Sequence, residues 1–164
     1  TLGIVGCGFV GKDLIQLLHA WDCSFLAHDL IEFDDFYKHY NVESVNLTDL
    51  LKRSDIVSLH LPLDESTQNI MDAKNLRLMK PSAILINAAR GGLVDETEVK
   101  HMLIENRLAA AAFDVFSTEP PGDNELLMLD NFFATPHLGG SSEEAILAMG
   151  MAAIDGLDNC SIPD

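Results

Sequence analysis

Three side chains in this sequence have types that could together carry out proton-transfer chemistry on a small anion. They are Arg90, Glu119 and His137. The planar guanidinium of an arginine can hold a carboxylate together with a neighbouring carbonyl oxygen. A histidine can give a proton to that oxygen while a hydride reaches the carbon, and a nearby carboxylate favours the imidazolium that carries the proton. The trio predicts reduction of a 2-keto acid or the reverse reaction, although each residue alone is as readily explained by a surface ion pair or a strand-end histidine.

A glycine-rich segment near the start of the sequence could hold the hydride carrier. Gly6, Gly8 and Gly11 form a GxGxxG pattern that follows an apolar run and opens an amphipathic one. The first glycine permits a tight turn, the second lets a pyrophosphate approach the backbone, and the third lets helix and strand pack closely. Asp29, eighteen residues after Gly11, suits ribose hydroxyls and would repel a 2′-phosphate, so NAD is favoured over NADP. The alternative is a structural turn followed by a surface aspartate.

The elements that must position these residues alternate along the chain. Apolar runs typical of buried strands occupy residues 2–5, 24–27, 42–45, 56–59, 83–86, 109–113 and 132–134. Apolar side chains recur with helical spacing in residues 9–20, 95–105 and 142–158. Ser141 and Glu144 have the spacing of a capping box at the start of the last helix. Nearly continuous apolar strands that alternate with helices predict an α/β fold with a doubly wound parallel sheet.

The residues with unusual chemistry follow the predicted strands. In open parallel sheets, ligands bind beyond the carboxyl ends of the strands. The residues at or shortly after these ends are Gly6, Asp29, His60, Leu61, Pro62, Ala88, Ala89, Arg90, Asp114, Glu119 and His137. Because the ends of parallel strands meet at one edge of a sheet, we expect these residues to gather there. This shared placement supports a dinucleotide and substrate site more strongly than any single motif does.

The composition narrows the class of protein. Hydrophobic residues make up 48% of the chain and charged residues 22%, which is typical of a globular domain. The formal net charge of −16 argues against a nucleic-acid partner, which needs clustered Lys and Arg. No apolar run reaches the roughly 18 residues of a membrane span. Three cysteines without a CxxC pair favour neither a disulfide framework nor a zinc site, so we expect no metal and a cytoplasmic location.

Five stretches of the chain resemble the D-isomer-specific 2-hydroxyacid dehydrogenases. They are TLGIVGCGFVG, VSLHLPLDESTQNIMD, LINAARGGLVDE, AAFDVFSTEPP and TPHLGGSS. The resemblance covers essentially the whole chain and implies an NAD-dependent oxidoreductase with a Rossmann fold. It implies that Arg90 binds the substrate, that Glu119 and His137 form the acid–base pair, and that Asp114 holds the nicotinamide carboxamide.

The resemblance also implies a set of NAD contacts. These fall on Phe9, Val10, Asp29, Leu61, Ala88, Ala89, Arg90, His137, Leu138, Gly139 and Gly140. We add His60 and Pro62, which flank Leu61, and of these His60 would line the adenine side. A packed histidine at the end of a strand is an equally good interpretation of His60.

The sequence departs from the family in one respect. Family members have a second, substrate domain, built from residues before the cofactor domain and a segment after its last helix, and this sequence shows neither part. We therefore assign residues 1–160 to an NAD-binding domain and residues 161–164 to the start of a linker. By itself the chain should bind NAD and turn over poorly, because an open cleft does not exclude water. The resemblance further implies a homodimer formed through the cofactor domains.

Several activities are compatible with the resemblance. The likeness of PHLGGSSEEA favours action on 3-phosphoglycerate, followed by reduction of glyoxylate or hydroxypyruvate. A related NAD enzyme that oxidises formate or phosphite is a further alternative, which a substrate panel would separate. An NAD-sensing co-repressor scaffold belongs to a different class and keeps the same three polar residues. A peptide-binding cleft in the other domain would distinguish that scaffold from an enzyme.

Overall fold

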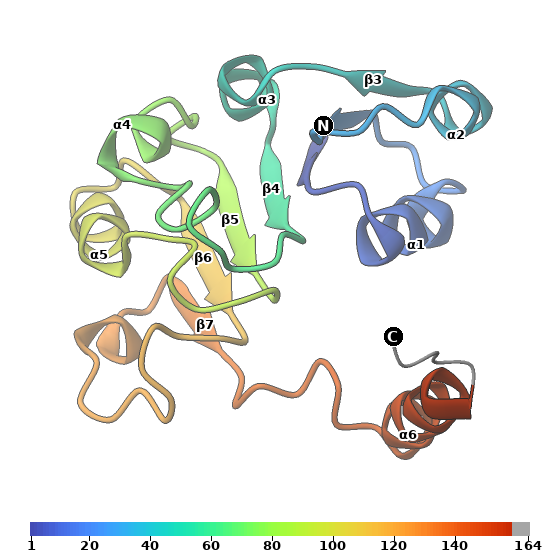
Figure 1. Cartoon of the computed structure of the whole chain (residues 1–164). Coiled ribbons are helices and arrows are strands. Elements are labelled where there is room, and N and C mark those ends of the chain that lie inside the picture. Colours follow the sequence, from blue (N-terminus) through green and yellow to red (C-terminus); the bar gives the residue numbers. More distant parts are fainter. Residues whose placement is uncertain (159–164) are drawn as a thin grey trace.

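A computed structural model describes residues 1–158, and its centre is a seven-stranded parallel sheet (Figure 1). The strands are β1 (Leu2–Val5), β2 (Phe25–His28), β3 (Val42–Ser44), β4 (Ile56–Leu59), β5 (Ile84–Asn87), β6 (Ala110–Phe113) and β7 (Phe132–Ala134). Their order across the sheet is β3-β2-β1-β4-β5-β6-β7, and all of these pairings are parallel. The chain winds outward from β1 to β3, crosses back to β4 and winds outward to β7. The predicted doubly wound sheet is therefore confirmed, with its topological switch between β1 and β4.

The helices cover the two faces of the sheet unequally. On one face of the β1–β3 half lie α1 (Phe9–Leu18) and α2 (Asp34–Tyr40), where Ile15 and Tyr37 join one core cluster with side chains of β1 and β2. The other helices, α3 (Leu47–Arg53), α4 (Ala73–Leu76), α5 (Glu96–Ile104) and the 3-10 helix η1 (Glu125–Met128), contribute to a second and larger cluster. That cluster also contains side chains of β4, β5 and β6. β1 and β2 contribute side chains to both clusters and are covered on both faces, whereas β5 and β6 alternate between buried and half-buried residues.

The last helix, α6 (Glu143–Asp158), stands apart from the sheet (Figure 1). It confirms the helix expected over residues 142–158, but its apolar stripe is more than half exposed, with Ile146 at 58% and Leu157 at 72%. The expected capping residue was wrong. The N–H of Ala145 donates to the hydroxyl of Ser142 at 3.1 Å, whereas the hydroxyl of Ser141 donates to the carbonyl oxygen of His137 at 3.3 Å.

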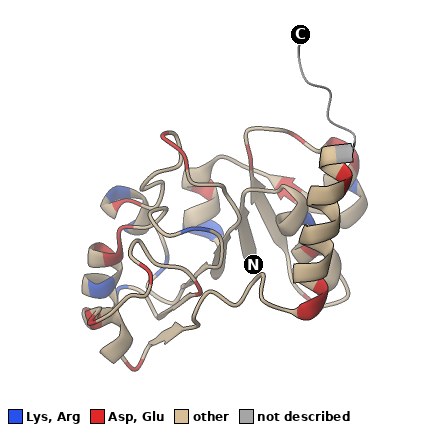
Figure 2. Ribbon diagram, turned by 60° about the horizontal axis from the view of Figure 1, so that its bottom comes forward, with Lys and Arg blue, Asp and Glu red and all other residues tan. Residues whose placement is uncertain are grey.

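The remaining features of the fold are the distribution of its charges, the lack of a membrane-spanning helix among residues 1–158, and the expected domain boundary. Acidic residues lie on helices and loops throughout the ribbon and do not form one cluster (Figure 2). No helix among residues 1–158 is long and apolar enough to cross a membrane. The boundary expected at residue 160 and the linker expected at residues 161–164 lie outside the described residues.

Candidate active site

The residues singled out from the sequence lie at the carboxyl edge of the sheet. The glycine loop follows β1, Asp29 follows β2, and His60, Leu61 and Pro62 follow β4. Residues 88–90 follow β5, Asp114 follows β6, and residues 137–140 come shortly after β7. The edge therefore has two parts, one beside β1 and β2 and one beside β5, β6 and β7.

Each of the three glycines in the loop lacks a side chain for a different structural reason. Gly6 has φ +93°, and a Cβ there would lie 2.7 Å from the carbonyl oxygen of His60. A Cβ on Gly11 would lie 2.4 Å from the carbonyl oxygen of Gly6, so the helix and the strand can approach only because it is absent. A Cβ on Gly8 would meet no atom within 4 Å, which leaves open space outside the loop. The loop therefore packs tightly against the protein at Gly6 and Gly11 and leaves space for a ligand at Gly8.

The start of α1 lacks the side-chain cap that four other helices have, as does the start of α2 after Phe33. α3, α4, α5 and η1 each begin after an Asn or Asp side chain that accepts a backbone hydrogen bond. α1 has Gly8 at that position and no side-chain cap. Its first N–H groups therefore have no acceptor from a capping side chain, and the open space over Gly8 lies in front of them. An anion such as a pyrophosphate fits such a helix end.

Asp29 is fixed next to the glycine loop. One carboxylate oxygen accepts the N–H of Cys7 at 2.6 Å and the other accepts the N–H of Ile31 at 3.0 Å. Phe9 and Val10 lie on the same loop and are 93% and 63% exposed. A carboxylate with remaining lone pairs and an uncovered apolar rim are the groups that a nucleoside would need.

The strand-end histidine, His60, is half-buried and engaged within the protein. Its Nε2 lies 2.9 Å from the hydroxyl oxygen of Ser58, and burial lowers the pKa of the imidazole. Pro62 contributes its carbonyl oxygen to the hydroxyl of Thr67 at 2.7 Å. Leu61 lies close to Gly6, whose Cβ would meet it at 2.9 Å. These contacts make the segment after β4 a wall of the glycine loop.

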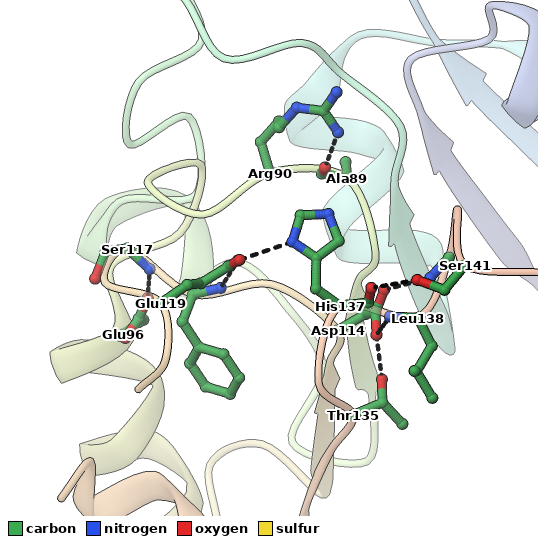
Figure 3. Close-up of polar contacts among 12 residues, drawn as sticks. Ala89, Arg90, Glu96, Asp114, Ser117, Glu119, Thr135, His137, Leu138 and Ser141 are labelled. Carbon is green, nitrogen blue, oxygen red and sulfur yellow. Dashed lines mark hydrogen bonds and ion pairs between the residues drawn. The ribbon is translucent and has the colours of Figure 1, made fainter. Parts of the chain in front are cut away.

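His137 and Glu119 form a direct pair beside β7. The imidazole Nδ1 lies 2.7 Å from Oε2 of Glu119, and Oε1 of the same carboxylate accepts the N–H of Phe116 at 3.0 Å. The hydrogen bond from His137, followed by the one from Phe116, lowers the pKa of Glu119. The imidazole points away from β7 and towards the turn of Ala89 and Arg90 (Figure 3). With Nδ1 held by the carboxylate, Nε2 is the nitrogen able to exchange a proton with a ligand.

Asp114 fixes the backbone on which His137 stands. Its carboxylate accepts the hydroxyl of Thr135 at 2.5 Å and the N–H groups of Leu138 and Gly139 at 2.7 and 2.9 Å. Partial burial acts to raise the pKa of Asp114, but these hydrogen bonds lower it overall. His137 itself has φ 54°, an unfavourable backbone conformation for a residue with a side chain. The Asp114 carboxylate thus holds this turn in shape.

Arg90 is the arginine without a carboxylate partner among residues 1–158. The other arginines pair with acidic side chains, Arg53 with Glu43, Arg77 with Glu98 and Arg107 with Glu105. The exposed guanidinium of Arg90 donates only to the carbonyl oxygen of Ala89, at 2.6 Å. It is therefore free to bind an external carboxylate at the mouth of β5.

Asn87, which we did not single out from the sequence, shapes the turn that carries Arg90. It is 1% exposed. Its amide donates to the carbonyl oxygen of Arg90 at 3.0 Å, and its side-chain oxygen accepts the N–H of Ala89 at 3.2 Å. The sequence feature that could have identified Asn87 is an amide side chain at the end of an apolar strand, where burial is expected. Such a polar group needs internal partners, and here the partners are the turn itself.

A cavity of about 410 Å³ adjoins the acid–base pair. Its walls are Asp114, Phe116, Glu119, Pro120, Pro121, Ala134, Thr135, Pro136 and His137. No group of three or more His, Cys, Asp or Glu side chains placed to hold a metal ion occurs in the described part of the chain. The arrangement combines an anion-accepting helix end, a free guanidinium and an imidazole that is hydrogen-bonded to a carboxylate, all at one sheet edge. Such a site can bind a dinucleotide and transfer a proton.

Comparison with known proteins identifies the family of the chain. Residues 1–139 match the model of the D-isomer specific 2-hydroxyacid dehydrogenase NAD binding domain. The chain is 41% identical over 151 residues to a D-3-phosphoglycerate dehydrogenase of Methanocaldococcus jannaschii, covering 92% of this chain and 29% of the relative. It is 37% identical over 158 residues to a hydroxypyruvate reductase of Thermotoga maritima, covering 94% and 51%.

A solved structure has the same fold. The NAD-complexed D-isomer specific 2-hydroxyacid dehydrogenase of Lactobacillus delbrueckii ssp. bulgaricus superimposes with a TM-score of 0.85 at 28% identity, over 99% of this chain and 54% of that one. The chain therefore spans about half of the length of these proteins or less. NAD, the cofactor expected from the glycine loop, is confirmed by the family model and by this neighbour. The chain belongs to the D-isomer-specific 2-hydroxyacid dehydrogenase family, of which it represents the NAD-binding domain.

Proposed function

We propose that this domain serves an NAD-dependent oxidoreductase that interconverts a D-2-hydroxy acid and a 2-keto acid. The observation that carries the proposal is the 2.7 Å pair of His137 and Glu119, whose imidazole points towards the unpaired Arg90. Both groups lie at the edge that also carries the glycine loop. Relatives that carry the names of such enzymes support it.

The residues have separate tasks in this proposal. Arg90 binds the substrate carboxylate and, through its second donor, the neighbouring oxygen. His137 gives the proton from Nε2 to the carbonyl oxygen during reduction and takes it back during oxidation. Glu119 holds Nδ1, and so keeps the imidazole in one orientation. NAD, when bound, supplies the hydride or accepts it.

Other residues bind and orient the cofactor in this proposal. The loop of Gly6, Gly8 and Gly11 and the uncapped start of α1 receive the pyrophosphate. Asp29 accepts hydrogen bonds from ribose hydroxyls and disfavours a 2′-phosphate, so that NAD binds in preference to NADP. Phe9, Val10, His60, Leu61 and Pro62 line the nucleoside side. Ala88, Ala89, Asp114 and residues 137–140 line the nicotinamide side.

The preferred substrate is 3-phosphoglycerate, with the keto product 3-phosphohydroxypyruvate. Relatives named for D-3-phosphoglycerate dehydrogenase and for hydroxypyruvate reductase match at 41% and 37% identity. Reduction of glyoxylate or hydroxypyruvate is therefore the second candidate. By itself the chain should bind NADH and turn over slowly, because the side chain of His137 is 51% exposed to water.

The substrate assignment is tested by turnover of the full-length protein. We would assay NADH oxidation with 3-phosphohydroxypyruvate, hydroxypyruvate, glyoxylate and pyruvate in one buffer. Arg90→Lys should raise KM for the active acid by roughly 10-fold or more, because a point charge replaces a bidentate fork. Arg107→Lys, which changes an exposed arginine away from the edge, serves as the matched control. NADH binding without oxidation by any acid would contradict the proposal.

We also propose a homodimer and a cytoplasmic location. Leu17 of α1 and Trp21 just after it are 75% and 70% exposed, and α6 adds its uncovered stripe. Burial of such side chains would favour self-association. Light scattering should give twice the mass of one chain, and Leu17→Asp should return the monomer.

The proposed cytoplasmic location rests on the cysteines. Cys7 and Cys23 are free, which suits a reducing compartment. Fractionation of cells would test the location.

A further inference from the structure

Glu96 joins two segments of the candidate active site. It is the first residue of α5, and its carboxylate reaches the loop that follows β6. Oε1 accepts the N–H of Ser117 at 2.7 Å, and Oε2 accepts the side-chain amide of Asn124 at 3.0 Å. Figure 3 shows the contact with Ser117 next to Glu119. Both oxygens of one carboxylate are thus used on a single loop.

That loop carries Glu119. No helix or strand occurs between Phe113, where β6 ends, and Glu125, where η1 begins. Ser117 follows Phe116, whose N–H holds Oε1 of Glu119 at 3.0 Å. Glu96 therefore fixes the peptide group next to the one that holds Glu119, and it fixes the far end of the loop through Asn124.

A close backbone contact joins the same two segments. A Cβ on Gly91 would lie 1.8 Å from the carbonyl oxygen of Phe116. The turn that carries Arg90 therefore lies directly against the start of the loop that carries Glu119. Residues 91–96 contact this loop at both of their ends, at Gly91 and at Glu96.

The neighbouring Glu98 shows what an ordinary acidic residue does in this helix. Acidic side chains in a first turn stabilise a helix through its dipole, and Glu96 and Glu98 share that position. Glu98 pairs with Arg77 at 2.9 Å, away from the loop. Glu96 forms no ion pair with any described Lys, Arg or His, and Lys100, one turn further, pairs with Glu125. Both carboxylate oxygens of Glu96 instead accept hydrogen bonds from the loop.

We propose that Glu96 is a positioning residue for the acid–base pair, acting through the backbone at Ser117 and through Asn124 to hold Glu119 against His137. The proposal rests on the proposed function for its effect on turnover. Its structural part, the dependence of the Glu119–His137 contact on Glu96, is measurable without turnover. Loss of the carboxylate should release the loop and let Glu119 move away from the imidazole.

The first test measures the contact between Glu119 and His137 directly, in crystal structures of the full-length protein without any substrate. In Glu96→Ala, the loop should shift, so that Nδ1 of His137 no longer lies within hydrogen-bond distance, about 3.5 Å, of Oε2 of Glu119. Glu98→Gln, which changes the neighbouring acidic residue, should keep the 2.7 Å contact. A wild-type contact in Glu96→Ala overturns the proposal, whatever the protein catalyses.

The second test reads turnover with the acid that is active in the substrate panel. Glu96→Ala should lower kcat by about 10- to 100-fold, the cost of a misplaced catalytic group, with the Kd for NADH unchanged. Glu96→Gln keeps one acceptor oxygen and should fall between Glu96→Ala and wild type, which also covers the case in which the alanine variant does not fold. In Glu119→Gln, the further change Glu96→Ala should add little, because both act on one contact. Full additivity, or a change in NADH affinity alone, would mean that Glu96 has a merely structural role.

Discussion

The two parts of the sheet edge build their sites by different means. Beside β1 and β2, the site consists mostly of backbone, namely glycines and an uncapped helix start, to which the carboxylate of Asp29 is added. Beside β5, β6 and β7, it consists of side chains held by hydrogen bonds, such as the pair of Glu119 and His137. The backbone part is sensitive to added atoms, and the side-chain part is sensitive to lost charges and partners. Substitutions in the two parts should therefore affect different steps.

The largest effect is expected in the side-chain part. His137→Gln should lower kcat for keto-acid reduction by roughly 10²- to 10⁴-fold, because it removes the proton donor. The affinity for NADH, measured by calorimetry, should change little. His101→Gln, on an exposed position of α5, is the control. Wild-type turnover in His137→Gln would break the assignment of the proton donor.

The next effect separates two glycines of one loop. Gly11→Ala should lower the free energy of unfolding by about 1–3 kcal/mol, because the new methyl group meets the backbone oxygen of Gly6 and overpacks the contact. Gly8→Ala should leave folding nearly unchanged and weaken NADH binding by roughly tenfold, about 1.4 kcal/mol. Urea denaturation and calorimetry give the two quantities. Equal losses of stability in both variants would show that Gly8 does not face open space.

This difference also explains how much the sequence could predict. The glycine loop was predictable because its glycines occupy positions that a short motif records, with a local steric demand at Gly6 and Gly11 and open space at Gly8. Arg90, Glu119 and His137 were found from their chemical types and the family motifs. Asn87, Glu96 and Thr135 were missed. Glu96 and Thr135 act on residues 21 positions away along the chain, and such contacts leave no local pattern.

The fold shows the same limit. The sheet was predictable because most of its strands are runs of apolar residues, with small shifts such as residues 24–27 against Phe25–His28. Three short helices, α2, α3 and α4, were not predicted. They have 7, 7 and 4 residues, too few for a clear helical period. Side-chain caps stabilise α3 and α4, whereas α2 has none and depends on packing. The exposed position of α6 did not follow from its amphipathic pattern either.

A smaller effect is expected for Asp29, whose carboxylate is the side chain added to the backbone part of the edge. Asp29→Asn should weaken NADH binding by about tenfold, since a hydrogen bond to a charged group contributes roughly 1.5 kcal/mol. NADPH should gain relative to NADH, because the charge that opposes a 2′-phosphate is gone. Competition binding with both nucleotides measures the ratio. Asp35→Asn, on exposed α2, is the control, and an unchanged ratio in Asp29→Asn would remove Asp29 from cofactor selection.

The smallest effect concerns pH and stability. Hydrogen bonds from His137 and from the N–H of Phe116 lower the pKa of Glu119 in the folded state. A carboxyl group with a lowered folded pKa stabilises the fold above its unfolded pKa of about 4.3, and this stabilisation is lost as the pH falls through the folded value. The difference in unfolding free energy between wild type and Glu119→Gln should be small, constant near pH 7, and should shrink below about pH 4. A difference that stays the same from pH 7 to pH 3 would contradict this account of Glu119.

The central claim is that the backbone part of the edge binds the dinucleotide and the side-chain part transfers the proton. The most direct measurement is the dependence of the keto-acid reduction rate on NADH concentration, in Gly8→Ala and His137→Gln side by side. We predict that Gly8→Ala raises KM for NADH and keeps kcat, and that His137→Gln lowers kcat and keeps KM for NADH. If both variants changed the same parameter, the division of the site into these two parts would be contradicted.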